Sequence, residues 1–164
     1  MELPKRKHPR LKNYDYSQYG CYFVTVCVKE RKNLLGTISV GRDAHIPPSV
    51  LLSDIGVIAN TYIQNMQSVY MGVAVDAYVI MPNHVHLLIR IEPSDQGGGG
   101  MWASRPTLHT IVRSFKTMVT KQIGHSIWQD SYYDRIIRNE NAYREALQYI
   151  DENPIKWQED ELYG

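Results

Sequence analysis

The sequence has few of the features that would place a protein outside a reducing compartment. Its 164 residues include only two cysteines, Cys21 and Cys27. Six residues apart on one predicted strand, they would lie about 20 Å from each other, too far for a disulfide bond. No apolar run approaches the roughly 18 residues of a membrane span, and the basic N-terminus lacks an apolar signal segment. We therefore expect a cytoplasmic protein with free thiols and no membrane partner.

Motifs of several enzyme classes are also missing. The chain has no H-E-x-x-H pair and no G-x-S-x-G turn, which weakens the zinc hydrolase and serine hydrolase interpretations. Four consecutive glycines at 97–100 lack the lysine and the serine or threonine of a phosphate-binding P-loop. We interpret the region of about 94–105 as a glycine-rich loop without a phosphate-binding role.

The formal net charge of +1 gives the whole molecule no electrostatic preference for nucleic acid, but the charge is unevenly distributed. Residues 1–14 hold five basic side chains against one glutamate, whereas residues 151–164 hold five acidic side chains against one lysine. A basic N-terminal arm of about residues 1–19 can contact phosphates, although charge alone favours a solvated tail. Chain length and a hydrophobic content of 43% predict a single domain over 1–164.

Hydrophobic periodicity predicts an α+β fold. In chain order, the predicted elements are strands over 20–30 and 34–43, a helix over 55–66 behind a Ser53 cap, strands over 73–80 and 84–91, a helix over 108–123, an extended segment over 131–139 and a helix over 140–153. The segment 34–43 is a candidate hairpin partner of the first strand. Because the two middle strands are joined tightly, we expect a central antiparallel sheet with helices packed on it, the first two covering one face.

Two histidines, His84 and His86, interrupt the apolar strand 84–91 on alternate residues. Successive strand residues alternate between faces, so both imidazoles share one face while Val85 lies on the other. Their Cα atoms would be about 6 to 7 Å apart, from which both rings can converge on one cation or one phosphate. Polar residues on an open face explain the pattern about equally well. Paired imidazoles, however, disfavour protonation and suit a metal, which would be Mg²⁺ or Mn²⁺ serving a phosphate, or Zn²⁺ serving a water.

The last predicted helix carries a candidate nucleophile. At about 100° per residue, the core stripe consists of Tyr143, Leu147, Ile150 and Pro154, whereas Tyr149 lies about 120° away from it. Asn153 follows Tyr149 by one turn and can serve the same site. Taken alone, Tyr149 would be interpreted as a boundary aromatic. Tyr132 and Tyr133 are rival nucleophiles, but at most one of them can face the histidines.

These motifs together resemble a known family. "MPNHVHLL" at 81–88, joined to "YI-x-x-NP" at 149–154, is similar to the REP-associated tyrosine transposases, relatives of the single-strand insertion-sequence transposases in the HUH endonuclease superfamily. The resemblance spans most of the chain and implies their ferredoxin-like or RRM-like HUH fold. It implies that His84 and His86 are metal ligands and that Tyr149 is the nucleophile. Asn153 matches the position of a third ligand, where relatives often have glutamine.

The resemblance implies cleavage and rejoining of single-stranded DNA at palindromic hairpins. A divalent ion, Mg²⁺ or Mn²⁺, would neutralise charge on the scissile phosphate while Tyr149 attacks, leaving a 5′-phosphotyrosine and a free 3′-hydroxyl. Because a phenol with a pKa of about 10 is a poor nucleophile, a base is needed, and Glu145 is a candidate one turn before the tyrosine.

The family's DNA contacts would come from two regions of this chain. Basic residues of the arm would read the sequence beside the hairpin, and those of the helix 108–123 would hold the backbone, although an exposed polar helix face explains the latter equally well. Aromatic residues could stack bases. The candidate DNA-binding residues are Lys5, Arg6, Arg10, Lys12, Arg113, Lys116 and Lys121, and the candidate stacking residues are Tyr14, Tyr16, Tyr19 and Trp102.

Two other functions stay open from the sequence. One is an RRM-like module that binds single-stranded nucleic acid without chemistry, and the other is a nuclease in which the metal activates water. The oligomeric state is open as well. Insertion-sequence relatives form dimers that exchange the tyrosine helix, whereas the REP-associated branch is expected to act as monomers, so a homodimer is one of two expectations.

Overall fold

The computed structural model describes residues 20–39, 45–92, 106–160 and 162–163. The predicted N-terminal arm and the glycine-rich loop lie outside these residues. The candidate DNA-contacting side chains that lie outside them are Lys5, Arg6, Arg10, Lys12, Tyr14, Tyr16, Tyr19 and Trp102. None of the described helices is both long and apolar enough to span a membrane.

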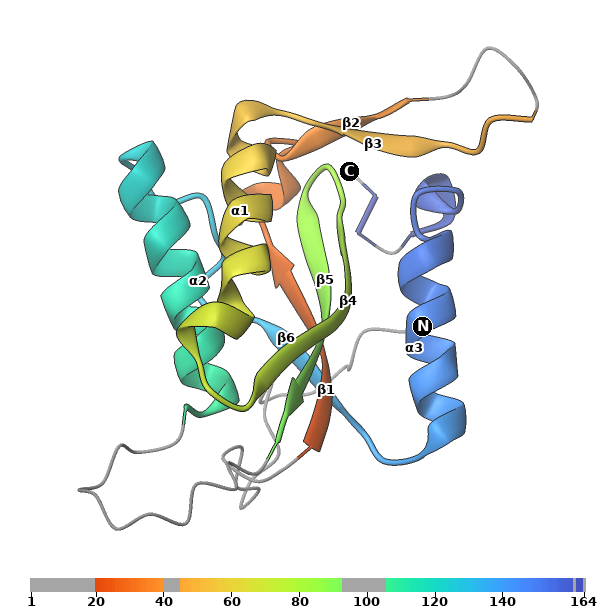
Figure 1. The fold of residues 1–164 in the computed structure, drawn as a ribbon. Helices are drawn as coiled ribbons and strands as arrows, with labels where there is room; N and C mark the ends of the chain where they lie inside the picture. The colour runs from red at the N-terminus through yellow and green to blue at the C-terminus, as the bar shows by residue number, and fades with distance from the viewer. Residues whose placement is uncertain (1–19, 40–44, 93–105, 161, 164) are drawn as a thin grey trace, which may run out of the picture.

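A four-stranded antiparallel sheet forms the centre of the fold (Figure 1). Its strands are β4 (Val73–Ile80), β5 (His84–Ile91), β1 (Gly20–Cys27) and β6 (Tyr133–Ile137), in that spatial order. Residues 81–83 join β4 to β5 in a tight turn, in which Met81 N donates to His84 O at 2.8 Å. Such a short connection allows only antiparallel pairing, as predicted.

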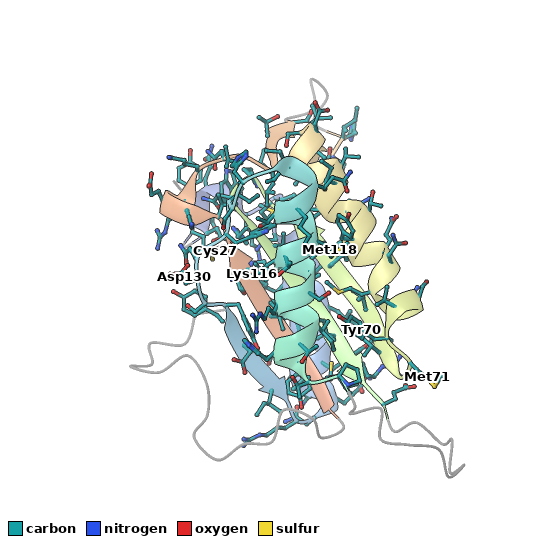
Figure 2. All side chains as sticks on the ribbon, turned by 90° about the vertical axis from the view of Figure 1, so that its left-hand side faces the viewer. Cys27, Tyr70, Met71, Lys116, Met118 and Asp130 are labelled. Atoms are coloured by element: carbon teal, nitrogen blue, oxygen red, sulfur yellow. The ribbon has the colours of Figure 1, made fainter. Side chains whose placement is uncertain are left out.

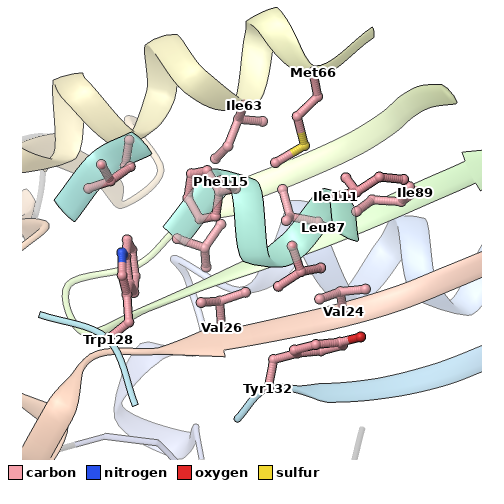
Figure 3. Packing of buried hydrophobic residues seen from close by; sticks show 14 of the residues in the cluster. Val24, Val26, Ile63, Met66, Leu87, Ile89, Ile111, Phe115, Trp128 and Tyr132 are labelled. Carbon is pink, nitrogen blue, oxygen red and sulfur yellow. The ribbon is translucent and has the colours of Figure 1, made fainter. Parts of the chain in front are cut away.

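One face of the sheet is covered by α1 (Asp54–Val69) and α2 (Leu108–Ile123), as Figure 1 shows. Val24, Leu87 and Phe115 are among the buried side chains that form the main core between the sheet and these helices (Figure 3). Side-chain caps set the helix starts, because Ser53 Oγ accepts from Gly56 N and Thr107 Oγ1 accepts from Thr110 N, each at 3.1 Å. The predictions of both helices and of the covered face are confirmed.

The opposite face is covered by a single long helix, α3 (Glu140–Glu152), and by the residues that follow it, and its core is smaller. It consists of Phe23, Leu88, Ile137, Ala146 and Ile150. Strand alternation places Val85 and Leu87 in the main core and His84 and His86 on the α3 side, as predicted. Polar side chains are therefore buried where the apolar layer is thinnest.

The predicted pairing of 34–43 with the first strand is wrong. The segment β2 (Gly36–Ser39) pairs instead with β3 (Ser49–Leu52), a strand that the two preceding prolines concealed. Both edges of β1 are already occupied, by β5 and β6, so no edge is left for β2. The β2–β3 hairpin is anchored next to the β4–β5 turn, because Leu35 N donates to Pro82 O at 2.9 Å.

The predicted core stripe of α3 is partly wrong. Ile150 is buried as expected, but the other fully buried side chain of the helix is Ala146, and Tyr143 is only half-buried. Tyr143 Oη donates to Asp76 Oδ2 at 3.0 Å. The helix is thus rotated so that Ala146, which brings α3 close to the sheet, faces the core, and Tyr143 is displaced toward its edge.

Both cysteines are free thiols, Cys27 being buried and Cys21 half-buried. Burial raises the pKa of Cys21 to about 11 and that of Cys27 to about 12, so both thiols are protonated at pH 8. Because the thiolate is the reactive form, we predict slow alkylation of both by iodoacetamide in the folded protein, and slowest of Cys27. Mass spectrometry of the Cys21→Ser and Cys27→Ser variants separates the two sites. If Cys27 in the folded protein were alkylated as fast as it is in urea, that rate would contradict its burial.

Candidate active site

The two histidines lie side by side at the start of β5, and both are fully buried. His84 Nε2 and His86 Nε2 are 2.9 Å apart, and the ring centroids are separated by 4.4 Å. Neighbouring ligands of an octahedral ion with bonds of about 2.1 Å are roughly 3 Å apart. The two nitrogens therefore already have the spacing of adjacent ligands around one divalent ion.

Asn83 fixes the tautomer of His84. Its Nδ2 donates to the carbonyl oxygens of Leu162 at 2.7 Å and Arg31 at 3.2 Å, so its Oδ1 is the atom that faces His84 Nδ1, at 2.8 Å. An amide oxygen can only accept, so His84 Nδ1 carries the proton. His84 Nε2 consequently presents a lone pair to the space beside His86.

Thr25 supports His86 in a more adaptable way. Thr25 Oγ1 lies 2.8 Å from His86 Nδ1, and a hydroxyl can either donate or accept. Since His84 Nε2 carries no proton, the 2.9 Å contact requires that His86 Nε2–H donates to it, and Thr25 Oγ1 then donates to His86 Nδ1. For both Nε2 atoms to serve as metal ligands, the His86 proton would have to be on Nδ1, from which Thr25 Oγ1 would accept a hydrogen bond. Thr25 on the neighbouring strand thus allows His86 to serve as a ligand.

Burial keeps both imidazoles uncharged at neutral pH. It lowers the pKa of His84 to about 4, opposed by the nearby Asp160 carboxylate, which raises it. Burial also lowers the pKa of His86 well below its usual value, and the neighbouring His84 lowers it further. Neutral imidazole is the form that binds metals, so both rings are ready as ligands.

Two residues near the end of the chain offer an oxygen atom that could be a third metal ligand. Asp160 Oδ2 lies 3.9 Å from His84 Nε2, its side chain is 3% exposed, and the ligand atoms of His84, His86 and Asp160 lie within 4.8 Å of one another. Asn153 is also buried, and its Oδ1 has no hydrogen-bond partner among the described residues. Two imidazoles with a carboxylate or amide oxygen fit a divalent cation.

Tyr149 lies against the histidine pair within the same chain. Its ring centroid is 5.2 Å from that of His86 and 5.7 Å from that of Phe23, both edge-to-face. Phe23 in turn stacks on His86 at 5.1 Å. Phe23 on β1 therefore holds the tyrosine of α3 and the histidine of β5 in one aromatic cluster, as the predicted convergence requires.

The rival tyrosines lie elsewhere. Tyr132 is 3% exposed and belongs to the main core under α2, on the far side of the sheet from the histidines. Tyr133 is paired with Thr25 and so shares the histidine face, but β1 lies between its strand and β5. Among the residues that the structure describes, Tyr149 is thus the tyrosine in ring contact with the pair, and Tyr133 is a natural control residue.

A family model described as "Transposase IS200 like" matches residues 16–153. The chain belongs to the IS200-like transposase family. It is 33% identical to a protein of Haemophilus influenzae named only as uncharacterized, over 96% of this chain and 93% of that one. It is also 29% identical to the REP-associated tyrosine transposase of Escherichia coli K12, over 50% of this chain and 44% of that one.

The fold of this transposase is similar to a solved structure of a REP-associated tyrosine transposase bound to a REP hairpin. The TM-score is 0.63 and the sequence identity 21%, over 90% of this chain and 74% of that one. The predicted α+β fold and the family resemblance drawn from the "MPNHVHLL" and "YI-x-x-NP" motifs are confirmed.

The basic residues predicted on α2 lie together, but not at the histidine pair. Arg113, Lys116 and Lys121 line a hollow of about 480 Å³ between α2 and the segment 126–132, shared with Trp128. Figure 2 shows Lys116 on α2 beside Asp130 of this segment. Lys116 Nζ donates to the carbonyl oxygens of residues 129 and 130, at 2.6 and 2.9 Å. The hollow is on the α2 face of the transposase, and the sheet separates it from the histidines.

Two charged residues border Tyr149 on the histidine face. Glu145, the candidate base, has a side chain that is 67% exposed, with Oε2 4.0 Å from Arg135 Nη2. Arg135 is paired with Phe23 and therefore lies on the same face as the aromatic cluster. The sequence pattern did not indicate Arg135, because its face depends on the register of β6 against β1. Nor did it indicate Asp160, which follows α3 without any periodic relation to Tyr149.

Removing the Thr25 hydroxyl should weaken metal binding. Thr25→Val keeps the shape of the side chain but offers no acceptor for a proton on His86 Nδ1, which the metal-bound tautomer requires. Since the loss of such a supporting partner costs about 10- to 100-fold in metal affinity, we expect a decrease of this size for Mn²⁺ in calorimetric titration. Thr25→Ser retains the hydroxyl and should bind like the wild type. Equal affinity of Thr25→Val and wild type would contradict this role.

Proposed function

We propose that this transposase cleaves and rejoins single-stranded DNA at palindromic hairpins through a 5′-phosphotyrosine on Tyr149. The observation that supports this most strongly is the contact between the Tyr149 and His86 rings within one chain. Relatives named as REP-associated tyrosine transposases, and the hairpin in the related solved structure, support a REP-like hairpin as the substrate. Such a substrate agrees with the cytoplasmic location expected from the sequence.

The metal would be Mg²⁺ or Mn²⁺, held by His84 and His86 with an oxygen ligand from Asn153, as the motif implies, or from Asp160. When bound, it supplies positive charge to the oxygens of the scissile phosphate. Neutral, buried histidines suit this role, because they add no charge that would compete with the cation. Exclusion of water by the surrounding aromatic rings strengthens electrostatic contacts to the phosphate.

The phenol of Tyr149 performs the transfer. Its oxygen attacks phosphorus, the bond from phosphorus to the 3′-oxygen breaks, and the leaving 3′-oxygen takes up a proton as the phenol loses one. One phosphodiester replaces another, so the energy of the broken bond is retained, and a second 3′-hydroxyl can reverse the step on a new strand. Glu145, one turn before Tyr149, is our candidate for the base, and Arg135 on the same face can pair with a phosphate oxygen.

The hairpin would contact the protein through the N-terminal arm and α2. Lys5, Arg6, Arg10 and Lys12 would read the bases beside the hairpin, and Arg113, Lys116 and Lys121 would hold its backbone. Because α2 and the histidines lie on opposite faces, a single substrate must pass around an edge of the sheet to contact both. The hollow between α2 and 126–132 adjoins β6, so the β6 edge offers the shorter route.

The decisive prediction concerns covalent attachment. With a labelled single-stranded hairpin and Mn²⁺, we expect a protein–DNA adduct on denaturing gels that is lost in Tyr149→Phe, because that variant lacks the attacking oxygen. Tyr133→Phe, on the same sheet face, should retain the adduct. Cleavage without an adduct would indicate a hydrolytic nuclease, and binding without cleavage would indicate a module that only binds; either result contradicts the proposal.

The site should function within one chain. We expect no recovery of cleavage when the inactive variants Tyr149→Phe and His86→Ala are mixed, because each chain contributes its own tyrosine and its own histidines. If the tyrosine helix were exchanged in a homodimer, mixed dimers would contain one intact site. Cleavage restored after co-refolding of the two variants would therefore show an exchanged dimer. Light scattering of the same samples gives the oligomeric state.

Phosphate contacts by α2 should appear in the salt dependence of binding. Each lost contact reduces the slope of log affinity against log salt by about 1. We therefore expect Arg113→Gln with Lys121→Gln to reduce the slope for a hairpin by about 2. Lys116 is left unchanged because its ammonium group holds the 129–130 backbone. A matched double change, Lys32→Gln with Arg144→Gln, removes two exposed charges that are paired with acidic neighbours and should leave the slope nearly unchanged. Equal slopes for the two double variants would argue against an α2 contact.

A further inference from the structure

The chain returns to the histidines after the tyrosine helix has ended. A short 3₁₀ helix, η2 (Trp157–Glu159), places the Trp157 ring 5.8 Å from the His84 ring. Leu162 is 3% exposed, and its carbonyl oxygen accepts from Asn83 Nδ2 at 2.7 Å. Asn83, which fixes the His84 tautomer, thus also binds the C-terminal segment 157–163. In Figure 1 this end of the chain lies beside the β4–β5 turn.

The Asp160 carboxylate is held toward the histidines by two hydrogen bonds. Its Oδ1 accepts from Leu162 N at 2.7 Å, and its Oδ2 accepts from Asn153 Nδ2 at 3.1 Å. Oδ2 is also the atom 3.9 Å from His84 Nε2. A nearly buried carboxylate is costly unless it is compensated. Here two donors compensate it in part, and the neutral imidazoles beside it add no positive charge.

The orientation of the Asn153 amide bears on whether this residue orients Asp160 or binds the ion itself. Its Nδ2 must face Asp160, because the reversed amide would bring two oxygens together. The amide oxygen of Asn153 is an uncharged ligand, whereas hard divalent cations prefer carboxylate oxygens. Asn153 is therefore better placed to orient the carboxylate than to replace it, as partners of metal ligands commonly do.

We propose that Asp160 is the third protein ligand of the divalent ion, and that Asn153 positions Asp160 instead of binding the ion itself. The proposal rests on the metal-dependent function above and names the ligand that completes its site. The ligand comes from a segment beyond the tyrosine helix, so the ion would link the C-terminal segment 157–163 to the central sheet. Metal binding and the stability of this segment are then coupled.

Mn²⁺ titration of the full chain by calorimetry tests the assignment without any DNA. We expect Asp160→Asn to lower the affinity at least tenfold and Asn153→Ala to lower it less. The double variant should be no weaker than Asp160→Asn, because Asn153 acts through Asp160. Glu159→Gln, an exposed neighbour, should bind like the wild type. Unchanged affinity in Asp160→Asn with a loss in Asn153→Ala would overturn the proposal and make Asn153 the ligand.

Proteolysis gives a second readout of the same assignment. Lys156 is the one basic residue in 151–164, so trypsin cleaves this end of the chain only there. Mn²⁺ should slow that cleavage several-fold in the wild type and should have no effect in Asp160→Asn. Equal cleavage of the wild type with and without Mn²⁺, despite binding, would overturn the coupling of this segment to the metal.

The two proposals fail in different ways. If the wild type binds Mn²⁺ and His86→Ala does not, while Asp160→Asn binds normally, only the assignment of Asp160 is wrong. If the wild type does not bind Mn²⁺ at all, the metal-dependent function itself is contradicted.

Discussion

The candidate active site depends on two neutral imidazoles whose Nε2 atoms face each other at 2.9 Å inside the protein. Because His84 carries its proton on Nδ1, this distance requires a proton on His86 Nε2, which donates to His84 Nε2. Asn83 and Thr25 hold the rings from behind, and burial keeps them uncharged. A cation held by both Nε2 atoms would take the place of this proton, and Thr25 Oγ1 would then accept from a proton on His86 Nδ1.

The unequal faces of the sheet make such a site possible. Two helices and a large apolar core on one face supply most of the burial that stabilises the fold, at roughly 25 cal/mol per Å² of apolar surface. The other face is covered by α3 and by residues that follow it, such as Trp157, with Ala146 allowing α3 a close approach. Polar residues can be buried there without disrupting the main core. Phe23, in ring contact with both Tyr149 and His86, shows how this thin layer still sets the position of the proposed nucleophile.

The local sequence pattern predicted much of this structure, but it did not predict which distant segments pair. The alternation of residues 84–91 predicted the face of both histidines, whereas the helical spacing of α3 predicted the burial of Ile150 but not that of Ala146. The partner of β2 was missed because it depends on which strands occupy the edges of β1, a property of the whole sheet. Asp160 and Arg135 were missed for the same reason. One reaches the site by a chain reversal after α3, and the other by the register of β6, and neither leaves a periodic signal.

The central claim is that one chain brings His84, His86 and Tyr149 around a common cation. A crystal structure of the Tyr149→Phe variant with Mn²⁺ and a hairpin, with data collected at the manganese absorption edge, tests it directly. The account predicts an anomalous peak within bonding distance of both Nε2 atoms, and a scissile phosphate between that ion and the substituted ring at position 149 of the same chain. A peak away from the histidine pair, or a ring at position 149 supplied to it by another chain, would contradict it.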